Sequence, residues 1–425
     1  METISVRLKS FLRVLSNTTR KLKCIMFSIV ITVTVLIWFY GSTTSEISLD
    51  HVRLHPSTGY VKYFSTSYSY RNNTPKILFW TPFFGSMVWY RESMNCIRLC
   101  PWKCELTDNK DEVTTSDALL FHLTDITWVG FVNNPGQYLQ FKFPGYRRPD
   151  QIWIAYNLEP LSMLWGNFHA FDGIFNWTWS YRRDADVYNP YGYFRSTTEN
   201  EKQEMAKHLK SSNYFREKNK TGLIINSNCN DDARRYKLVH ELSKYVDIDW
   251  YGGCGFKCPD DYRSCDVLNT KYKLYFAFEN AHCRDYISEK FWRRHTYHQI
   301  PVVAWKIDYK GMVPPNSYIN VFDFSDLNSA GKYIAHVANN ETLFNSYFDW
   351  MKDYTADGGY CGMCRVCRAL HTKNRSAQVY EDFNGWLTDD SCKPASITRF
   401  AQRSIDRLVF DGKTGIFNTK FLETS

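Results

Sequence analysis

The most chemically informative stretch of the chain follows a short apolar run at residues 274–278. This run ends in a polar pair at 279–280, and after a short loop we expect a helix to start at Ser288, Glu289 and Lys290. A helix amino terminus that follows a strand attracts anions, because its free N–H groups and its dipole point outward. Lys290 adds a full positive charge, and Glu289 can accept hydrogen bonds from ribose hydroxyls. The segment therefore suits a nucleoside diphosphate, although a capped helix with solvated charges explains the same spacing equally well.

Similar short apolar runs recur along the chain and predict the elements that position this segment. They lie at 77–80, 118–121, 152–155, 222–225, 248–251, 274–278 and 300–304, and helical patterns lie at 201–211, 233–246 and 288–298. Two consecutive β/α series predict an α/β fold with two Rossmann-like, doubly wound domains, at 76–215 and 216–375, before an extension at 376–425. The expected ligand site is the cleft between the two domains, at the carboxyl ends of their strands.

The net charge of +8 is concentrated at the amino terminus. Residues 1–23 contain six basic residues and one acid, so this segment alone carries +5 and the remaining chain has no strong basic field. A nucleic-acid partner is therefore not expected. The following residues, 24–41, include no charge, which predicts an uncleaved transmembrane signal-anchor; a cleaved signal peptide is the alternative. Residues 1–23 would then be cytoplasmic, 42–75 a luminal stem, and the rest of the chain luminal.

This orientation changes the interpretation of the 13 cysteines. One lies in the expected membrane span, and the other twelve face an oxidising compartment where disulfides persist. Cys361, Cys364 and Cys367 have the spacing of half a zinc or iron–sulfur site, but we expect them to form disulfides with one another or with Cys392. Luminal glycosylation sequons fit the same route and occur at Asn72, Asn176, Asn219, Asn340 and Asn374.

The segment 274–305 also resembles a known family. The blocks FAFEN at 276–280, DYISEK at 285–290 and PVV at 301–303 are similar to the donor-binding signature of the α1,3-fucosyltransferases. The resemblance extends to FNWTWSYRRDADVYNPYG at 175–192 and IWIAYNLEP at 152–160. It covers roughly residues 76–370 and implies a two-domain fold of the GT-B type.

The resemblance implies an inverting transfer of L-fucose from GDP-fucose to the 3-hydroxyl of N-acetylglucosamine. The acceptor would be a glycoprotein glycan, either the N-glycan core or a Lewis- or LacdiNAc-type antenna. It also implies a single-pass type II protein of the Golgi membrane with a luminal catalytic part. No metal would be required, with Mn²⁺ or Mg²⁺ at most stimulatory. The alternative from another class is a membrane-anchored, lectin-like glycan-binding protein without catalysis.

The resemblance also assigns roles to individual residues. Glu159 matches the general base of the family, although Pro160 and Leu161 stand where members often have Ser-Pro. Arg234 fits best as the arginine that binds the donor diphosphate, and Arg235 is the second choice. The other donor-binding positions that the resemblance indicates are Asn280, Tyr286, Glu289 and Lys290.

One motif within the resemblance has the appearance of a metal site. Asp184-Ala185-Asp186 has the spacing with which paired carboxylates hold Mg²⁺ or Mn²⁺ against a nucleotide diphosphate. Because the family does not require a metal there, we expect a structural role, with charge pairing to Arg182 or Arg183.

Overall fold

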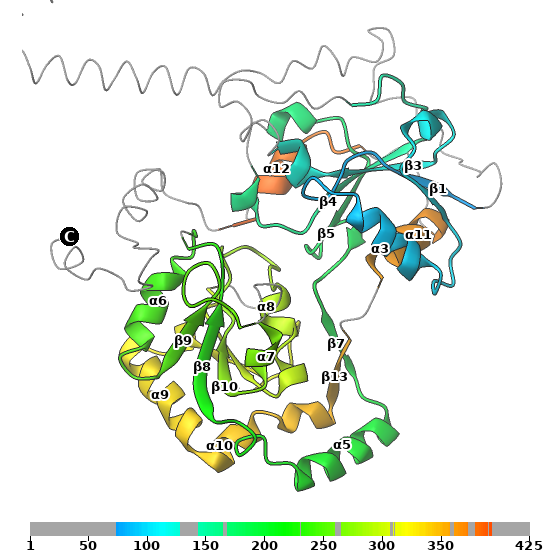
Figure 1. Ribbon diagram of the computed structural model, residues 1–425. Coiled ribbons are helices and arrows are strands. Elements are labelled where there is room, and N and C mark those ends of the chain that lie inside the picture. The colour runs from blue at the N-terminus through cyan, green and yellow to red at the C-terminus, as the bar shows by residue number, and fades with distance from the viewer. Residues whose placement is uncertain are drawn as a thin grey trace, which may run out of the picture.

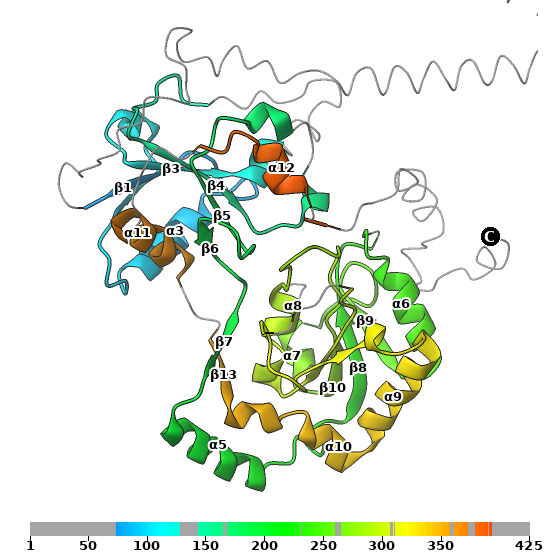
Figure 2. The same cartoon turned by 180° about the vertical axis from the view of Figure 1, so that it is seen from behind.

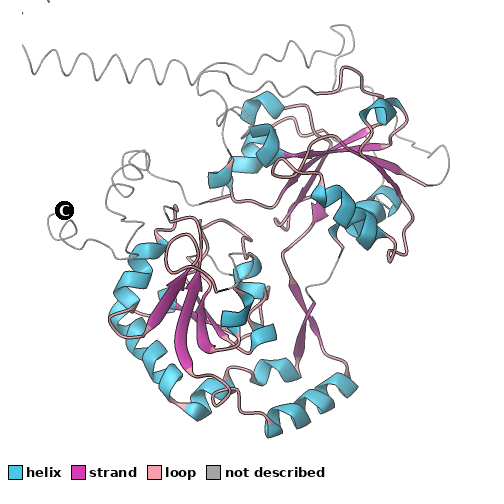
Figure 3. Cartoon of the chain, viewed as in Figure 1, coloured by secondary structure: helices cyan, strands magenta, loops and turns pink. Residues whose placement is uncertain are grey.

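The computed structural model describes residues 74–392, apart from 128–142, 165–167, 230, 260–264, 307–308, 310, 358–360, 373–378 and 390. These residues form two lobes, each built on a parallel sheet (Figures 1 and 3). The expected cytoplasmic segment, the membrane span and nearly all of the stem lie outside the described residues. Within the described part of the chain, no helix has the length and apolar character to cross a membrane.

The first lobe is built on a six-stranded sheet in the order β2-β1-β3-β4-β5-β6, with every neighbouring pair parallel. Its strands are β1 (Lys76–Phe79), β2 (Glu105–Thr107), β3 (Ala118–His122), β4 (Ile152–Asn157), β5 (Trp177–Ser180) and β6 (Val187–Tyr188). All residues of β3 and β4 are buried, because helices cover both faces of a parallel sheet. The strand order reverses between β1 and β3, and this switch point opens at the carboxyl ends of the strands.

The faces of this sheet are covered partly by helices from the far end of the chain. The helical elements are α3 (Val88–Ile97), α11 (Gly362–Thr372), α12 (Phe383–Thr388) and the 3₁₀ turns η2 (Lys110–Thr114), η3 (Leu161–Met163) and η4 (Phe168–Phe171). Met363 and Val366 of α11 share a core with β1 and α3, while Phe383 of α12 packs with Phe171 on the opposite face (Figure 1). Residues 362–372, which the expected domain at 216–375 includes, therefore pack in the first lobe.

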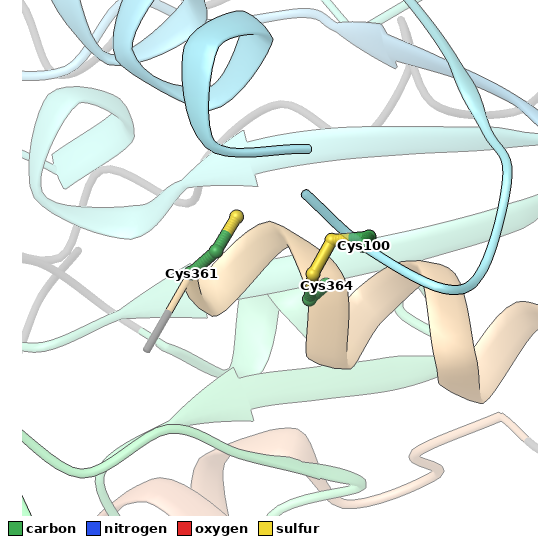
Figure 4. Close-up of side chains that lie close together, drawn as sticks. All are labelled: Cys100, Cys361 and Cys364. Carbon is green, nitrogen blue, oxygen red and sulfur yellow. A yellow bond between two sulfur atoms is a disulfide. The ribbon is translucent and has the colours of Figure 1, made fainter. Parts of the chain in front are cut away.

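Three disulfides join α3 and the segment after it to α11. They pair Cys96 with Cys361, which directly precedes α11, Cys100 with Cys364, and Cys104 with Cys367. Figure 4 shows the bond between Cys100 and Cys364. The cysteines recur at nearly one-turn spacing along two adjacent segments, so each meets a partner. The expectation that the cysteines of 361–367 bond with one another or with Cys392 is wrong. Their sulfurs are in disulfides and are not available as metal thiolates.

The second lobe is built on a five-stranded sheet in the order β12-β11-β10-β8-β9, again with every neighbouring pair parallel. Its strands are β8 (Lys220–Ile225), β9 (Ile248–Tyr251), β10 (Tyr272–Phe276), β11 (Ile300–Val303) and β12 (Ile319–Asn320). The helical elements are α6 (Arg235–Leu242), α7 (Asp266–Asn269), α8 (Glu289–Trp292), η5 (His295–Tyr297), η6 (Val321–Asp323), α9 (Leu327–Asn339) and α10 (Glu341–Ser346). All seven expected strands are present, and the two parallel sheets confirm the predicted α/β class.

The chain crosses between the lobes along a two-stranded antiparallel ribbon. Its strands are β7 (Tyr193–Ser196) and β13 (Tyr354–Asp357), which lie between the first lobe and α5 (Glu199–Ser211) in both views (Figures 1 and 2). The 3₁₀ turn η7 (Asp349–Lys352) precedes β13, and Lys202 of α5 pairs with Asp353 at 2.6 Å. The outgoing and returning connections are thus held side by side.

Candidate active site

Glu159 follows β4 in a turn that is held from two sides. Its backbone N–H donates to Asn157 Oδ1 at 3.1 Å, and Asn157 Nδ2 donates to the Glu159 carbonyl at 2.6 Å. The preceding carbonyl, of Leu158, accepts a hydrogen bond from the Tyr191 hydroxyl at 2.7 Å. The backbone that carries the carboxylate is therefore fixed, and the side chain remains half-buried at the carboxyl edge of the first sheet.

A cluster of aromatic rings connects this turn to the second lobe. Tyr286, from the segment after β10, lies 5.0 Å from the ring of Tyr181 and 6.1 Å from that of Tyr191. Leu158 packs on the same cluster, so the neighbour of Glu159 and a predicted donor-binding residue share one buried group. The structure therefore brings Glu159 and the segment 279–290 together.

The charges around Glu159 come from that second-lobe segment. Burial raises the pKa of Glu159 above its ordinary value; Lys290 opposes this rise, while Glu289 and Glu279 add to it. A carboxylate with a raised pKa is a stronger base and accepts a proton more readily. This arrangement increases the basicity of Glu159.

The predicted helix start at Ser288 is present and rests on a buried carboxylate. Glu279, which is 4% exposed, accepts hydrogen bonds from the Ser288 N–H and hydroxyl, both at 2.7 Å. Lys290 Nζ lies 3.1 Å from Glu289 and 3.7 Å from Glu279. Burial pushes the pKa of Lys290 down, but these two carboxylates raise it above its ordinary value, so its ammonium stays charged. Because α8 has four residues, its dipole is smaller than expected, and the charge of Lys290 is shared with the two carboxylates beside it.

The two arginines after β8 have different surroundings. Arg235 is buried and bonds to Asp231 at 2.6 Å, to the Asn228 carbonyl at 2.9 Å and to the Phe278 carbonyl at 3.3 Å. Arg234 is exposed and has a left-handed backbone with φ of 54°, which is uncommon for a residue with a side chain. Arg235 is thus held by protein groups and its charge acts on Lys290, whereas Arg234 is the solvent-exposed guanidinium of the two.

Backbone hydrogen bonds place Arg234 beside residues 279–290, which include the predicted donor-binding residues and are called the donor segment below. The N–H of Ala233 donates to the Asn280 carbonyl at 3.1 Å, while Arg235 reaches Phe278. Asn280 also has a buried side-chain oxygen, Oδ1, with no hydrogen-bond partner among the described residues. A buried acceptor without a donor is unfavourable, and a hydroxyl of a bound ligand would satisfy it. Both loops follow β8 and β10, the strands that flank the switch point of the second sheet.

The DxD-like aspartates have protein partners of their own. Asp184 pairs with Arg182 at 2.7 Å and with Arg284 at 2.6 Å. Asp186 accepts hydrogen bonds from the Thr178 N–H at 3.0 Å and from the Tyr380 hydroxyl at 2.7 Å. The predicted pairing of Asp184 with Arg182 is thus present, whereas Arg183 pairs instead with Asp285.

One expected glycosylation site is incompatible with the fold. Asn176 is 1% exposed, and its Oδ1 accepts hydrogen bonds from the Trp153 N–H at 2.8 Å and from Arg147. A glycan cannot be attached to a side chain enclosed in this way, so the expectation is wrong at this position. Asn219 is exposed and Asn340 is half-buried at the start of α10. Asn72 and Asn374 lie outside the described residues.

Two groups of polar residues in this region were not predicted from the sequence. Glu279 is one, and its signal is a carboxylate at the end of an otherwise apolar strand. The other is His122, which bonds through Nδ1 to Asp125 at the switch point of the first sheet. Asp125 also accepts the N–H groups of Phe84 at 2.7 Å and Gly85 at 2.8 Å. A histidine that ends the apolar run 118–121 was the signal.

Comparison with known proteins finds two family models and several relatives that are similar to this chain. The family model described as "Fucosyltransferase, N-terminal" matches residues 72–192, and "Glycosyltransferase family 10 (fucosyltransferase) C-term" matches residues 215–386. Alpha-(1,3)-fucosyltransferase fut-5 of Caenorhabditis elegans is 30% identical over 77% of this chain and 86% of its own length. The mouse 4-galactosyl-N-acetylglucosaminide 3-alpha-L-fucosyltransferase 9 is 32% identical over 69% of this chain and 76% of its own length. A crystal structure of an α1,3-fucosyltransferase with GDP-fucose matches 76% of this chain and 97% of its own, with a TM-score of 0.46 and 16% identity.

Proposed function

This chain belongs to glycosyltransferase family 10, the fucosyltransferases, and from this premise we propose that it is an α1,3-fucosyltransferase. The donor is GDP-fucose, and the acceptor is the 3-hydroxyl of N-acetylglucosamine in a glycoprotein glycan. The names of the nematode and mouse relatives support the linkage, and the mouse name also specifies an N-acetylglucosaminide acceptor. Family membership favours this activity over a lectin-like function without catalysis.

The observation that carries the proposal is the meeting, across the two lobes, of a carboxylate of raised pKa with the segment that carries Lys290. Leu158, next to Glu159, shares a buried cluster with Tyr286, and Lys290 is among the charges that act on Glu159. A glycosyl transfer needs both groups together, because the acceptor oxygen must lose a proton as the donor loses its diphosphate. A binding protein has no need for this combination.

We propose an inverting displacement in one step. Glu159 takes the proton of the acceptor 3-hydroxyl while that oxygen forms a bond to the anomeric carbon of fucose. The bond between this carbon and the β-phosphate oxygen breaks, and GDP leaves with the bonding electron pair. The β-linked sugar thus becomes α-linked through an oxocarbenium-like state. A positioned general base typically contributes about 10²- to 10⁴-fold to such a step.

The donor-side residues divide into two roles. Arg234 and Lys290 stabilise the negative charge that develops on the departing diphosphate, as preorganised cations do in transfer reactions. Asn280, Tyr286 and Glu289 bind the nucleoside and the sugar. The buried Oδ1 of Asn280 accepts a hydrogen bond from a hydroxyl of GDP-fucose. Because two protein cations serve the diphosphate, no metal is required; Mn²⁺ or Mg²⁺ stimulates at most, by screening the phosphates.

The protein is proposed to act in the Golgi, as a type II membrane protein with both lobes in the lumen. The support is the positively charged segment 1–23 followed by the uncharged run 24–41. The six disulfides between described cysteines support an oxidising compartment. Protease protection of the lobes in sealed microsomes, with an accessible amino-terminal tag, tests this orientation.

An acceptor panel tests the activity. The full chain is incubated with GDP-fucose and with core N-glycans, N-acetyllactosamine and LacdiNAc, and the products are analysed by mass spectrometry. A mass increase of one deoxyhexose on at least one acceptor, removed by an α1,3-specific fucosidase, is the expected result and distinguishes core from antenna. If every acceptor stays unmodified while the protein is folded, the proposal is wrong.

A further inference from the structure

Two charged pairs join the lobes at the donor segment. Arg183 and Asp184 follow β5 in the first lobe, and Arg284 and Asp285 follow β10 in the second. Arg284 lies 2.6 Å from Asp184, while Arg183 lies 2.9 Å from Asp285 and donates its backbone N–H to the same carboxylate at 3.0 Å. Two consecutive residues of one loop thus pair with two consecutive residues of the other.

A disulfide anchors the same segment covalently. Cys283 directly precedes Arg284 and is bonded to Cys392, which follows α12. The Arg284 N–H also donates to the Ser391 carbonyl at 2.6 Å. Since Phe383 and Leu387 of α12 are part of the first-lobe core, this disulfide ties a second-lobe loop to the first lobe.

Arg182 completes the connection from the first-lobe side. Its guanidinium lies 4.3 Å from the ring centre of Trp386 in α12, bonds to the carbonyl of Trp386, and pairs with Asp184 at 2.7 Å. Arg182 is 3% exposed, so its charge requires these partners. A continuous chain of contacts therefore runs from α12 through Arg182 and Asp184 to Arg284.

The donor segment is consequently supported by both lobes. Residues 283–285 are bonded to the first lobe, and the second lobe holds the same segment through the Tyr309 hydroxyl, which donates to the Cys283 carbonyl at 2.8 Å, and through Glu279, which accepts from Ser288. Tyr286 lies between these supports, and Glu289 and Lys290 follow Ser288 directly. Asp285 has a left-handed backbone with φ of 61°, a conformation that aspartate adopts more readily than most residues.

We infer that Arg183, Asp184, Arg284 and Asp285, together with the Cys283–Cys392 disulfide, are positioning residues for the donor. They keep the donor segment in register with Glu159 by fixing it to the lobe that carries this base. Asp184, the first aspartate of the DxD-like motif, thus anchors the loop that contains Arg284. The inference rests on the proposed function, because it takes GDP-fucose as the ligand of this segment.

The test compares Arg284→Gln, Arg284→Lys and a matched control in the full chain. The control is Arg216→Gln, which removes an arginine–carboxylate pair of 3.0 Å between Arg216 and Glu341 inside the second lobe. We measure the Kd of GDP by titration, KM for GDP-fucose, KM for the acceptor, and thermal unfolding. Arg284→Gln should raise the GDP Kd and the donor KM by about 2- to 5-fold, the effect of losing one partly exposed pair. The acceptor KM and the unfolding midpoint should match the control, and Arg284→Lys should restore most of the loss.

Asp285→Asn is a second variant that does not depend on Arg284. Asparagine tolerates the left-handed backbone and keeps the shape of the side chain, but it loses the charge and one of the two oxygens that accept from Arg183. It should raise the donor KM as Arg284→Gln does. A donor KM equal to that of the control in both variants, with an active wild type, overturns the positioning role alone. A wild type that binds no GDP overturns this role and the proposed function together.

Discussion

Replacing the buried Arg235 should damage folding, while replacing its exposed neighbour Arg234 should damage donor binding. Arg235→Met leaves Asp231, which is 5% exposed, without its charge partner and removes donors from the Asn228 and Phe278 carbonyls. Breaking a buried ion pair in this way typically costs about 3–5 kcal/mol of the free energy of unfolding. Arg234→Gln removes an exposed charge and should change stability by less than about 0.5 kcal/mol.

The assay is equilibrium urea unfolding with the disulfides intact, followed by GDP titration of the folded variants. Replacing both buried partners, as in Asp231→Leu with Arg235→Met, should recover much of the stability, because no unpaired charge remains. Arg234→Gln should weaken GDP binding by roughly 10-fold, the equivalent of about 1.4 kcal/mol for a lost charge-assisted contact. If Arg235→Met retains wild-type stability and loses GDP affinity while Arg234→Gln does not, the two roles are reversed and the reasoning is refuted.

Three further outcomes are expected. Burial raises the pKa of Glu159, and this base must be ionised to accept a proton. We therefore expect kcat/KM to fall with decreasing pH, through a pKa above the ordinary glutamate value of about 4.3. A pH–rate profile whose acid limb lies at or below that value contradicts the assignment. Replacing Cys100 and Cys364 with serine should lower the free energy of unfolding by less than the roughly 2–5 kcal/mol typical of a lone native disulfide. The reason is that the bridges 96–361 and 104–367 close nearly the same loop. A larger loss in denaturant unfolding contradicts this expectation. Glycopeptide mapping should find Asn176 unmodified and Asn219 available, and a glycan on Asn176 would contradict its burial in the first sheet. Asn176→Gln should lower the free energy of unfolding by about 1–3 kcal/mol, because the Trp153 N–H loses its acceptor.

The strands were predictable because a parallel sheet buries both faces, so each strand is a continuous apolar run. The 118–121 run, for example, lies in β3. The ends of elements were less predictable: β10 stops at Phe276, two residues before its apolar run does, and Glu279 just beyond it accepts hydrogen bonds from Ser288. The expected helix 288–298 divides into α8 and η5, and the left-handed backbone of His298 ends the second of these.

The parts that sequence reasoning missed depend on contacts between distant residues. Nothing local places α11 beside α3, because that contact is made by three disulfides that span more than 260 residues. The family resemblance ranked Arg234 before Arg235, but the burial of Arg235 against Asp231 could not be read from the sequence. The ordinary sequon at Asn176 likewise gave no sign that its side chain lies inside the sheet.

The most direct test of the central claim is the turnover of Glu159→Gln together with its affinity for GDP. The substitution keeps the size of the side chain and removes its basicity, while Arg234, Asn280 and Lys290 remain. Fucose transfer, followed by mass spectrometry on an acceptor of the wild type, should fall by about 10²- to 10⁴-fold, with the Kd of GDP within about 2-fold of the wild-type value. Near-normal turnover in this variant would contradict the assignment of Glu159, in the first lobe, as the general base that acts with the donor-binding residues of the second lobe.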